Sequence, residues 1–259
     1  MSDLRYKIVL ITGGSGGLGQ GLAAAFAREE ARVVIAARDR DRLNAAAEKM
    51  AQNGTQVLAL PCDISQRDQV QSLGEEIKTL WGDVQILINN AGIARAVNFS
   101  DMPAALWDET LATNLTGAYN CCKVFLPAMI QAKWGRVINI ASTTAKVGYS
   151  HVTAYTASKH GLLGLTRSLA LETARAGVTV NAICPGYIDD ERTRENAKIM
   201  AEKTGKSAGD ILKLFAASSP QNRLIAPAEV ASLALLMASK ELSGMTGQAI
   251  NVDGGAVMV

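Results

Sequence analysis

The sequence predicts an α/β fold in which helices cover both faces of a doubly wound parallel sheet of about seven strands. Short apolar runs alternate with helix-like segments of about 12–25 residues along the whole chain of 259 residues. Connections of that length can return each strand parallel to the one before it. No linker, repeat or low-complexity tract interrupts the alternation, so we expect a single domain over residues 1–259.

The first half of the chain opens with an apolar run, KIVLIT, that ends in glycines and predicts a buried strand. Similar runs predict three further strands, and the segments between them have helical composition. We expect Gly54 to end the second helix and Ser65 to cap the third. The predicted strands are residues 7–12, 32–37, 57–61 and 84–89, and the predicted helices are residues 17–30, 39–53 and 65–81.

The second half repeats the alternation with longer helices. Its first helical segment predicts one or two helices, with a break near residues 107–108. Pro185 and Gly186 are expected to end the sixth strand. The predicted helices are residues 104–133, 153–177, 192–217 and 227–240, and the predicted strands are residues 135–141, 178–184 and 248–252.

Composition excludes several classes of protein. The net charge is only +2, basic and acidic residues are interleaved, and aromatic residues make up 5%, so no nucleic-acid surface is expected. The first apolar run has six residues, too few for a signal peptide or a membrane span. Four cysteines without a C-x-x-C pattern favour a reduced, cytoplasmic setting, and two histidines suggest no metal site.

A glycine-rich stretch, TGGSGGLG, lies between the first strand and the first helix, at residues 12–19. It fits two patterns, one through Gly14, Gly16 and Gly19 and the other through Gly13, Gly17 and Gly19. In either pattern, glycines let the backbone approach a pyrophosphate, and the helix N-terminus favours its charge. The alternative is a flexible turn, but the strand-to-helix context favours a dinucleotide site. The expected contacts are Gly13, Ser15, Gly16, Gly17, Leu18 and Gly19.

The end of the second strand predicts which dinucleotide binds. An NAD site there usually carries an acidic residue that binds the ribose 2′-hydroxyl. This chain instead has Ala36, Ala37 and Arg38, and an arginine can bind a 2′-phosphate. Asp39 and Asp41 follow and are interpreted as caps of the next helix. The sequence therefore predicts NADP(H) rather than NAD(H).

Tyr155 and Lys159 are four residues apart in a predicted helix and so share one face. A free tyrosine has a pKa of about 10, and a neighbouring ammonium lowers it toward a useful range for proton transfer. The pair on its own is a weak signal, because one partly buried and one solvated residue have the same spacing. Ser142, thirteen residues before Tyr155, completes a candidate catalytic group.

Together these features resemble the short-chain dehydrogenase/reductase family, over essentially the whole chain, and imply a Rossmann-like fold. The resemblance implies that Tyr155 is the general acid and base, that Lys159 lowers its pKa and binds the nicotinamide ribose, and that Ser142 binds the substrate oxygen. It implies that Asn114 supports a water-linked proton path, and that the chain is a homotetramer joined through residues 107–133 and 153–177. Further cofactor contacts implied by the motifs are Asp63, Ile64, Asn90, Ala91, Gly92, Pro185, Gly186 and Ile188.

One position departs from the family pattern. A threonine that contacts the nicotinamide amide is common four residues after the glycine of Pro-Gly, and this chain has Asp190 there. An ionised aspartate can accept a hydrogen bond from the amide but cannot donate one. Thr193 is the alternative contact if the loop shifts.

The resemblance also suggests a substrate, a 3-oxoacyl thioester or related ketone, as in polyketide-type ketoreductases. Residues 187–217 are expected to form a lid over it, and Ser142, Thr144, Tyr149, Tyr155 and Tyr187 to line its pocket. Lys146, Arg95, Arg192 and Arg194 either meet an acyl carrier or CoA phosphate, or are simply solvated. The alternatives are a short-chain alcohol or sugar dehydrogenase and a non-catalytic NADP-binding sensor.

Overall fold

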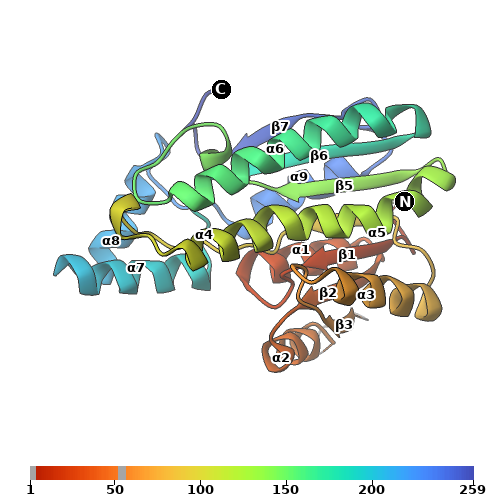
Figure 1. Cartoon of the computed structure of the whole chain (residues 1–259), viewed down its shortest axis with the longest axis horizontal. Coiled ribbons are helices and arrows are strands. Elements are labelled where there is room, and N and C mark those ends of the chain that lie inside the picture. Colours follow the sequence, from red (N-terminus) through yellow and green to blue (C-terminus); the bar gives the residue numbers. More distant parts are fainter. Residues whose placement is uncertain (1–3, 52–56) are drawn as a thin grey trace.

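The computed structural model describes residues 4–51 and 57–259 and contains a seven-stranded sheet (Figure 1). Its strand order is β3-β2-β1-β4-β5-β6-β7, and every neighbouring pair is parallel. The predicted fold class is therefore confirmed. The strands are β1 (Ile8–Thr12), β2 (Arg32–Ala37), β3 (Val57–Pro61), β4 (Ile86–Asn89), β5 (Gly135–Ile140), β6 (Val178–Pro185) and β7 (Ala249–Val252).

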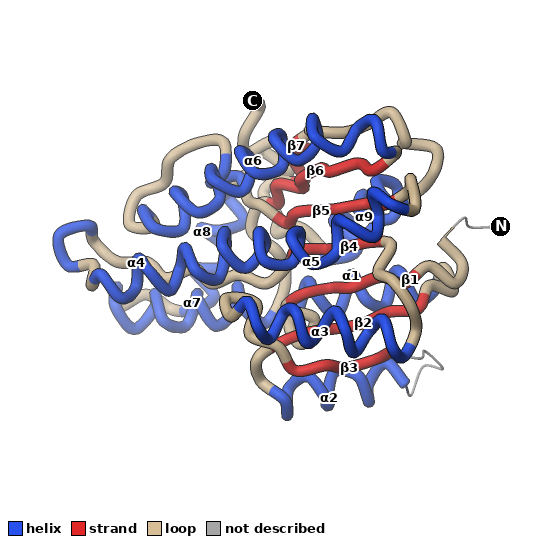
Figure 2. Tube along the Cα trace, turned by 45° about the vertical axis from the view of Figure 1, so that its right-hand side comes forward, coloured by secondary structure: helices blue, strands red, loops and turns tan. Residues whose placement is uncertain are grey.

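Helices cover both faces of the sheet (Figure 2). Alternate residues of β1 point to opposite faces: Ile11 packs in the cluster of Phe26 and Met237, and Leu10 packs in the cluster of Leu73. The first cluster belongs to α1 (Gly17–Arg28), α2 (Arg40–Ala51) and α9 (Pro227–Ala238), and the second mainly to α3 (Arg67–Leu80) and α5 (Gly117–Gln131). The remaining helices are α4 (Ala104–Leu111), α6 (Thr153–Thr173), α7 (Glu191–Thr204) and α8 (Ala208–Ala217).

The site is located by the point where the strand order reverses. The chain runs outward from β1 through β2 to β3 and then returns to β4, on the other side of β1. Loops leaving the carboxyl ends of β1 and β4 therefore diverge and open a crevice there. The segments α4, α7 and α8 project past one end of the sheet (Figures 1 and 2), and α7 with α8 follows the carboxyl end of β6.

The break in the long helical segment was predicted at the wrong place. The helix continues through Trp107 and Asp108, and the irregularity is a π-helical turn at Ala112–Thr116. Asn114 lies in that turn, where its side chain binds the backbone of Ile93 and the hydroxyl of Ser158. Such turns are frequent at functional sites because they redirect one side chain without ending the helix.

The predicted lid helix is two helices. Gly205, with φ of +70°, ends α7, and Ser207 begins α8 by accepting a hydrogen bond from the backbone N–H of Asp210. The predicted cap of α3 was also wrong: Gln66 is the cap residue, and the hydroxyl of Ser65 instead binds Asp63. The expected stop at Gly54 lies outside the described residues.

Candidate active site

The glycine-rich loop after β1 follows the second of the two glycine patterns. Gly13 has φ of +67°, and a side chain there would lie 2.8 Å from Cα of Ala91. A side chain at Gly19 would overlap the carbonyl oxygen of Gly13, and one at Gly17 would overlap Asp190. Gly16 faces open space, with no atom within 4 Å of an added methyl group. Gly14 also lacks room, because an added methyl group would lie 2.6 Å from Cβ of Ile35. Gly16 is therefore the position that separates the two patterns, since a side chain fits there, while Gly13, Gly17 and Gly19 all require glycine.

The loop is held to β4 by a small hydrogen-bond network. Thr12 Oγ1 accepts bonds from the backbone N–H groups of Asn90 and Ala91, at 3.0 and 3.1 Å. The Asn90 amide donates to the carbonyl oxygens of Thr12 and Gly13, at 2.9 and 3.2 Å. Asn90 therefore shapes the loop directly, and its predicted place beside the adenosine remains a prediction.

The carboxyl ends of β2 and β3 carry the residues predicted for the adenosine end. Arg38 is exposed, and Asp39 caps α2 as interpreted, accepting from the N–H of Arg42 at 3.0 Å. Asp63 forms a turn in which Oδ1 accepts from both the N–H and the hydroxyl of Ser65. The cation of Arg38 is thus presented to solvent, where a phosphate can reach it.

The predicted catalytic residues come together at the carboxyl end of β5. Tyr155 and Lys159 project from α6, with the lysine Nζ 5.7 Å from the centre of the tyrosine ring. Ser142 follows β5, and its hydroxyl lies close enough to Tyr155 to lower the pKa of the tyrosine. A methyl group added at Gly92 would lie 3.2 Å from Asn114 Oδ1 and 3.6 Å from Lys159 Nζ, so this glycine leaves room beside both.

The ionisation of the pair departs from the expectation. Burial lowers the pKa of Lys159 to about 7, helped by the positive charge of Arg192. Burial also raises the pKa of Tyr155, while the hydrogen bond from Ser142 and the charge of Arg192 act in the opposite direction. The expected lowering of the tyrosine pKa by Lys159 is therefore not found, because desolvation dominates and a lysine with a pKa near 7 carries only part of a charge.

Lys159 Nζ lies 2.7 Å from the carbonyl oxygen of Ile140, the last residue of β5. A chain of buried amides below it fixes the helix against the sheet. The Asn89 amide donates to Asn139, at 2.8 Å, and the Asn139 amide donates to the hydroxyl of Thr166, also at 2.8 Å. This chain links β4, β5 and α6, and so sets how α6 presents its catalytic face.

The predicted substrate residues form one group beside Tyr155. Tyr187 has a pKa raised by burial and by the nearby Tyr149 and Tyr155, and its ring stacks on Phe215 of α8 at 4.3 Å. Thr144 Oγ1 is buried and has no hydrogen-bond partner in the described ranges 4–51 and 57–259. Because this oxygen is inaccessible to solvent, the contact of Thr144 with a substrate stays a prediction.

The first turn of α7 lies against the glycine loop. Asp190 stands where the family often has a threonine that contacts the nicotinamide amide; here its side chain packs on Gly17 and its Oδ1 caps α7. Thr193, the alternative contact, is buried, and its backbone N–H donates to Asp190. Arg192 donates to the carbonyl oxygen of Gly92.

The other basic residues considered for an acyl carrier are already engaged. Lys146 donates to the carbonyl oxygens of Ala249 and Val259, at 2.8 and 2.6 Å, and lines a hollow of about 600 Å³ beside β7. Arg95 pairs with Glu109 at 3.4 Å, and Arg194 pairs with Asp189 at 2.5 Å. Lys146 is therefore held by the C-terminal segment.

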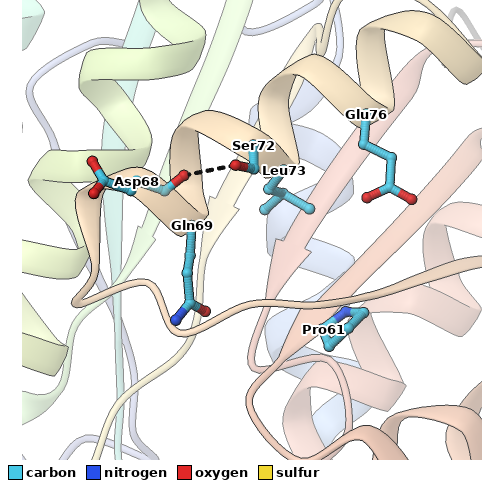
Figure 3. A pocket seen from close by; sticks show the side chains of 6 residues that line it. All are labelled: Pro61, Asp68, Gln69, Ser72, Leu73 and Glu76. Carbon is cyan, nitrogen blue, oxygen red and sulfur yellow. Dashed lines mark hydrogen bonds between the residues drawn. The ribbon is translucent and has the colours of Figure 1, made fainter.

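Other features of the described chain add no second site. A shallow pocket between the end of β3 and α3 contains none of the predicted site residues (Figure 3); it is lined by Pro61, Asp68, Gln69, Ser72, Leu73 and Glu76. Among the residues that the structure describes, no His, Cys, Asp and Glu side chains form a group able to hold a metal. No helix within them is long and apolar enough to cross a membrane.

Comparison with known proteins shows to which family the chain belongs. The sequence model of the short chain dehydrogenases matches residues 7–201. The chain belongs to the short-chain dehydrogenase family. It is therefore an oxidoreductase, and the motifs that carried the resemblance are those of its own family.

Relatives of this short-chain dehydrogenase match along nearly their whole length. A D-beta-hydroxybutyrate dehydrogenase of Cupriavidus necator is 34% identical over 256 residues, which cover 98% of this chain and 99% of the relative. The oxidoreductase UcpA of Salmonella typhimurium is 37% identical over 259 residues, covering 100% and 97%. A crystal structure of a variant of actinorhodin polyketide ketoreductase with NADPH superposes with a TM-score of 0.94, at 31% identity and 99% coverage of both chains.

Several residues of the site escaped sequence reasoning. Asn139 and Thr166 hold α6 to the sheet, yet nothing in their local pattern distinguishes them from ordinary strand and helix residues. Arg42 meets Glu191, 149 positions away in the sequence, and only the tertiary fold brings them together. Gly205 and Ser207, by contrast, are a typical helix stop and a typical helix cap. These two residues could have predicted from the sequence that residues 192–217 form two helices.

Proposed function

We propose that this short-chain dehydrogenase reduces a ketone to a secondary alcohol with NADP(H), reversibly, and that the ketone is a 3-oxoacyl thioester or a related compound. The observation that carries the proposal is the convergence of Ser142, Tyr155, Lys159 and Asn114 beside a glycine loop, with Arg38 at its far end. A proton donor, a cation and a phosphate cradle at one sheet edge fit hydride transfer coupled to proton transfer.

The residues present fit a dinucleotide. Gly13, Gly17 and Gly19 leave no room for side chains, and the N–H groups at the start of α1 suit a pyrophosphate. Arg38 would hold the 2′-phosphate, and Lys159 the nicotinamide ribose. The predicted contacts Pro185, Gly186 and Ile188 lie on the segment that leaves β6. The nicotinamide, when bound, supplies the hydride.

The protein then supplies position and a proton. Ser142 and Tyr155 would hydrogen-bond the substrate oxygen, and Tyr155 would donate its proton as negative charge develops there. The raised pKa of Tyr155 keeps the phenol protonated at neutral pH and so suits the reductive direction. Lys159 has a pKa of about 7, so it can gain and lose a proton near neutral pH. It would exchange this proton with the water-linked path that Asn114 supports.

The substrate class is supported by the pocket wall and by relatives. Tyr149 and Tyr187 offer hydroxyl groups and aromatic surface without a fixed charge, which suits an acyl chain with polar oxygens. Two relatives act, by their names, on 3-hydroxybutyrate or on polyketides. Residues 187–217 would serve as the lid, with the Tyr187–Phe215 stack joining the loop after β6 to α8.

We further propose that the protein works as a cytoplasmic homotetramer. The cysteines that the structure describes are free and buried, which agrees with a reducing compartment. Exposed apolar side chains on α5 and α6, among them Tyr119, Ile130 and Leu171, would be covered by subunit contacts. Sedimentation at several protein concentrations tests the assembly.

The decisive experiment follows NADPH consumption with acetoacetyl-CoA and, in parallel, with simple ketones, aldehydes and sugars. We expect turnover with the 3-oxoacyl thioester to exceed that with the other carbonyl compounds. Turnover only of the simple ketones, aldehydes or sugars would assign the alternative dehydrogenase class. Cofactor binding without turnover of any compound would assign the sensor class.

A further inference from the structure

Three consecutive residues at the start of α7 touch three different parts of the cofactor crevice. Asp190 packs on Gly17 of the glycine loop, and Glu191 pairs with Arg42 in the first turn of α2. Arg192 donates to the carbonyl of Gly92 after β4. The turn 190–192 therefore spans the crevice from its adenosine side to its nicotinamide side.

The contact at Gly17 places a carboxylate at the first residue of α1. A methyl group built on Gly17 would lie 2.7 Å from Oδ2 of Asp190, so the acid rests directly against the glycine. The start of a helix attracts negative charge, because its N–H groups and dipole point there. Asp190 thus holds a carboxylate beside the helix end that suits a pyrophosphate, while its Oδ1 accepts from the N–H of Thr193.

The contact at Arg42 also places a carboxylate where a phosphate of the cofactor is expected, here at the adenosine side. Its guanidinium lies 3.4 Å from a carboxylate oxygen of Glu191, and the backbone of Arg42 is bound by Asp39, which directly follows Arg38. Because Glu191 follows Asp190, Arg42 reaches toward the same side of the crevice as the glycine loop. Arg42 is thus a second cation, besides Arg38, near the expected 2′-phosphate.

We propose that the carboxylates of Asp190 and Glu191 compete with the phosphate groups of the cofactor, Asp190 at the glycine loop and Glu191 at Arg42. The inference rests on the proposed NADP(H) site and adds to it. Asp190 weakens the binding of any dinucleotide, because every dinucleotide carries a pyrophosphate. Glu191 weakens only NADP(H), because only the 2′-phosphate needs Arg42. The two acids thereby limit affinity and favour release of the cofactor after turnover.

The test measures dissociation constants of NADPH and NADH by the fluorescence of the reduced nicotinamide, with no substrate present. Asp190→Asn keeps the shape of the side chain and an oxygen able to cap α7. It should tighten both cofactors by about tenfold. Glu191→Gln should tighten NADPH by about two- to fivefold and leave NADH unchanged, since exposed pairs are weak.

Two further variants serve as controls. Glu195→Gln removes a charge from an exposed position of the same helix and should leave both constants at the wild-type value. In an Arg42→Ala background, Glu191→Gln should lose its effect on NADPH, because the two residues act as a pair. Melting temperatures of all variants show whether each remains folded.

Distinct results would overturn the inference. Unchanged binding of both cofactors by Asp190→Asn would show that the aspartate does not compete with the pyrophosphate. Weaker binding would mean that it assists binding, for example at the nicotinamide amide. Equal tightening of NADPH and NADH by Glu191→Gln would show that Arg42 does not serve the 2′-phosphate. Failure of the wild-type protein to bind either cofactor would refute the proposed function itself, at a step that involves no variant.

Discussion

Lys159 donates a buried hydrogen bond of 2.7 Å to the carbonyl oxygen of Ile140, and so ties the catalytic face of α6 to the end of β5. The lysine is only 3% exposed and still must be able to carry a charge. Its pKa is lowered from 10.5 to about 7 because burial disfavours the ammonium. Burial of Lys159 therefore costs stability whenever the lysine is protonated.

Lys159→Met should stabilise the fold most at low pH. A lysine whose pKa falls on folding binds its proton more weakly in the folded state, so its burial destabilises the fold fully below about pH 7. That destabilisation shrinks as the pH rises from about 7 toward 10.5. The difference in melting temperature between variant and wild type should thus be more positive at about pH 6 than at about pH 9. The hydrogen bond to Ile140 is lost at both pH values and so does not affect this comparison. If the difference in melting temperature does not change with pH, the assigned pKa of Lys159 is wrong.

Tyr155→Phe should reduce turnover by about 10²–10⁴-fold, because the ring remains and the proton donor is lost. The dissociation constant for NADPH should stay within about twofold of wild type. Steady-state kinetics and cofactor fluorescence measure the two effects separately. Tyr6→Phe is the matched control, since Tyr6 is exposed and precedes β1, at the end of the sheet away from the site. Comparable losses in both variants would argue against the assignment of Tyr155.

Arg38→Ala should raise the KM for NADPH by about tenfold or more and change that for NADH little, because only NADPH carries the 2′-phosphate. The control is Arg40→Ala, an exposed arginine at the start of α2. It should leave both KM values near wild type. If the wild-type enzyme prefers NADH, the predicted cofactor is wrong.

Thr144→Val should stabilise the fold by up to ~1–2 kcal/mol, because it replaces a buried hydroxyl without a protein partner by a methyl group of similar size. If the hydroxyl meets the substrate, kcat/KM should fall at the same time by about tenfold. Urea denaturation and kinetics on the same preparations separate the effects. Lower stability would show that the hydroxyl already has a partner.

Gly19→Ala should destabilise the protein strongly, because the added methyl would overlap the carbonyl of Gly13. A loss of about 2 kcal/mol or more in the free energy of unfolding is expected. Gly16→Ala is the natural comparison, since Gly16 faces open space and has φ of −117°. It should change stability by only a few tenths of a kcal/mol, up to about 1. Equal effects would contradict the chosen glycine pattern.

The sequence was informative wherever the signal was local. The spacing of Tyr155 and Lys159 follows from helix periodicity, and the strand ends follow from apolar runs, so the proximity of these two residues could be predicted. Their catalytic roles stay a prediction. The two glycine patterns could not be separated, because the choice depends on contacts with Ala91 and Asp190. These are distant in sequence.

Other errors have the same physical origin. The π-helical turn holds Asn114 against Ile93 and Ser158, and no periodicity before residue 112 signals it. The role of Asp190 was left open by the sequence, because its packing on Gly17 depends on the tertiary fold. Burial also reversed the expected pKa shift of Tyr155, since desolvation depends on the whole fold rather than on one neighbour.

The buried arginine of β5 has a consequence for engineering. Arg136 is 2% exposed, stacks on Trp134 at 4.7 Å, and donates to carbonyls of Gly135, Gly177 and Ser239. It joins three chain segments near the start of β5, whereas Ser142 and the proposed lid follow the carboxyl ends of β5 and β6. A library confined to the proposed lid, residues 187–217, would therefore leave the contacts of Arg136 intact while it changes the surroundings of the proposed substrate pocket.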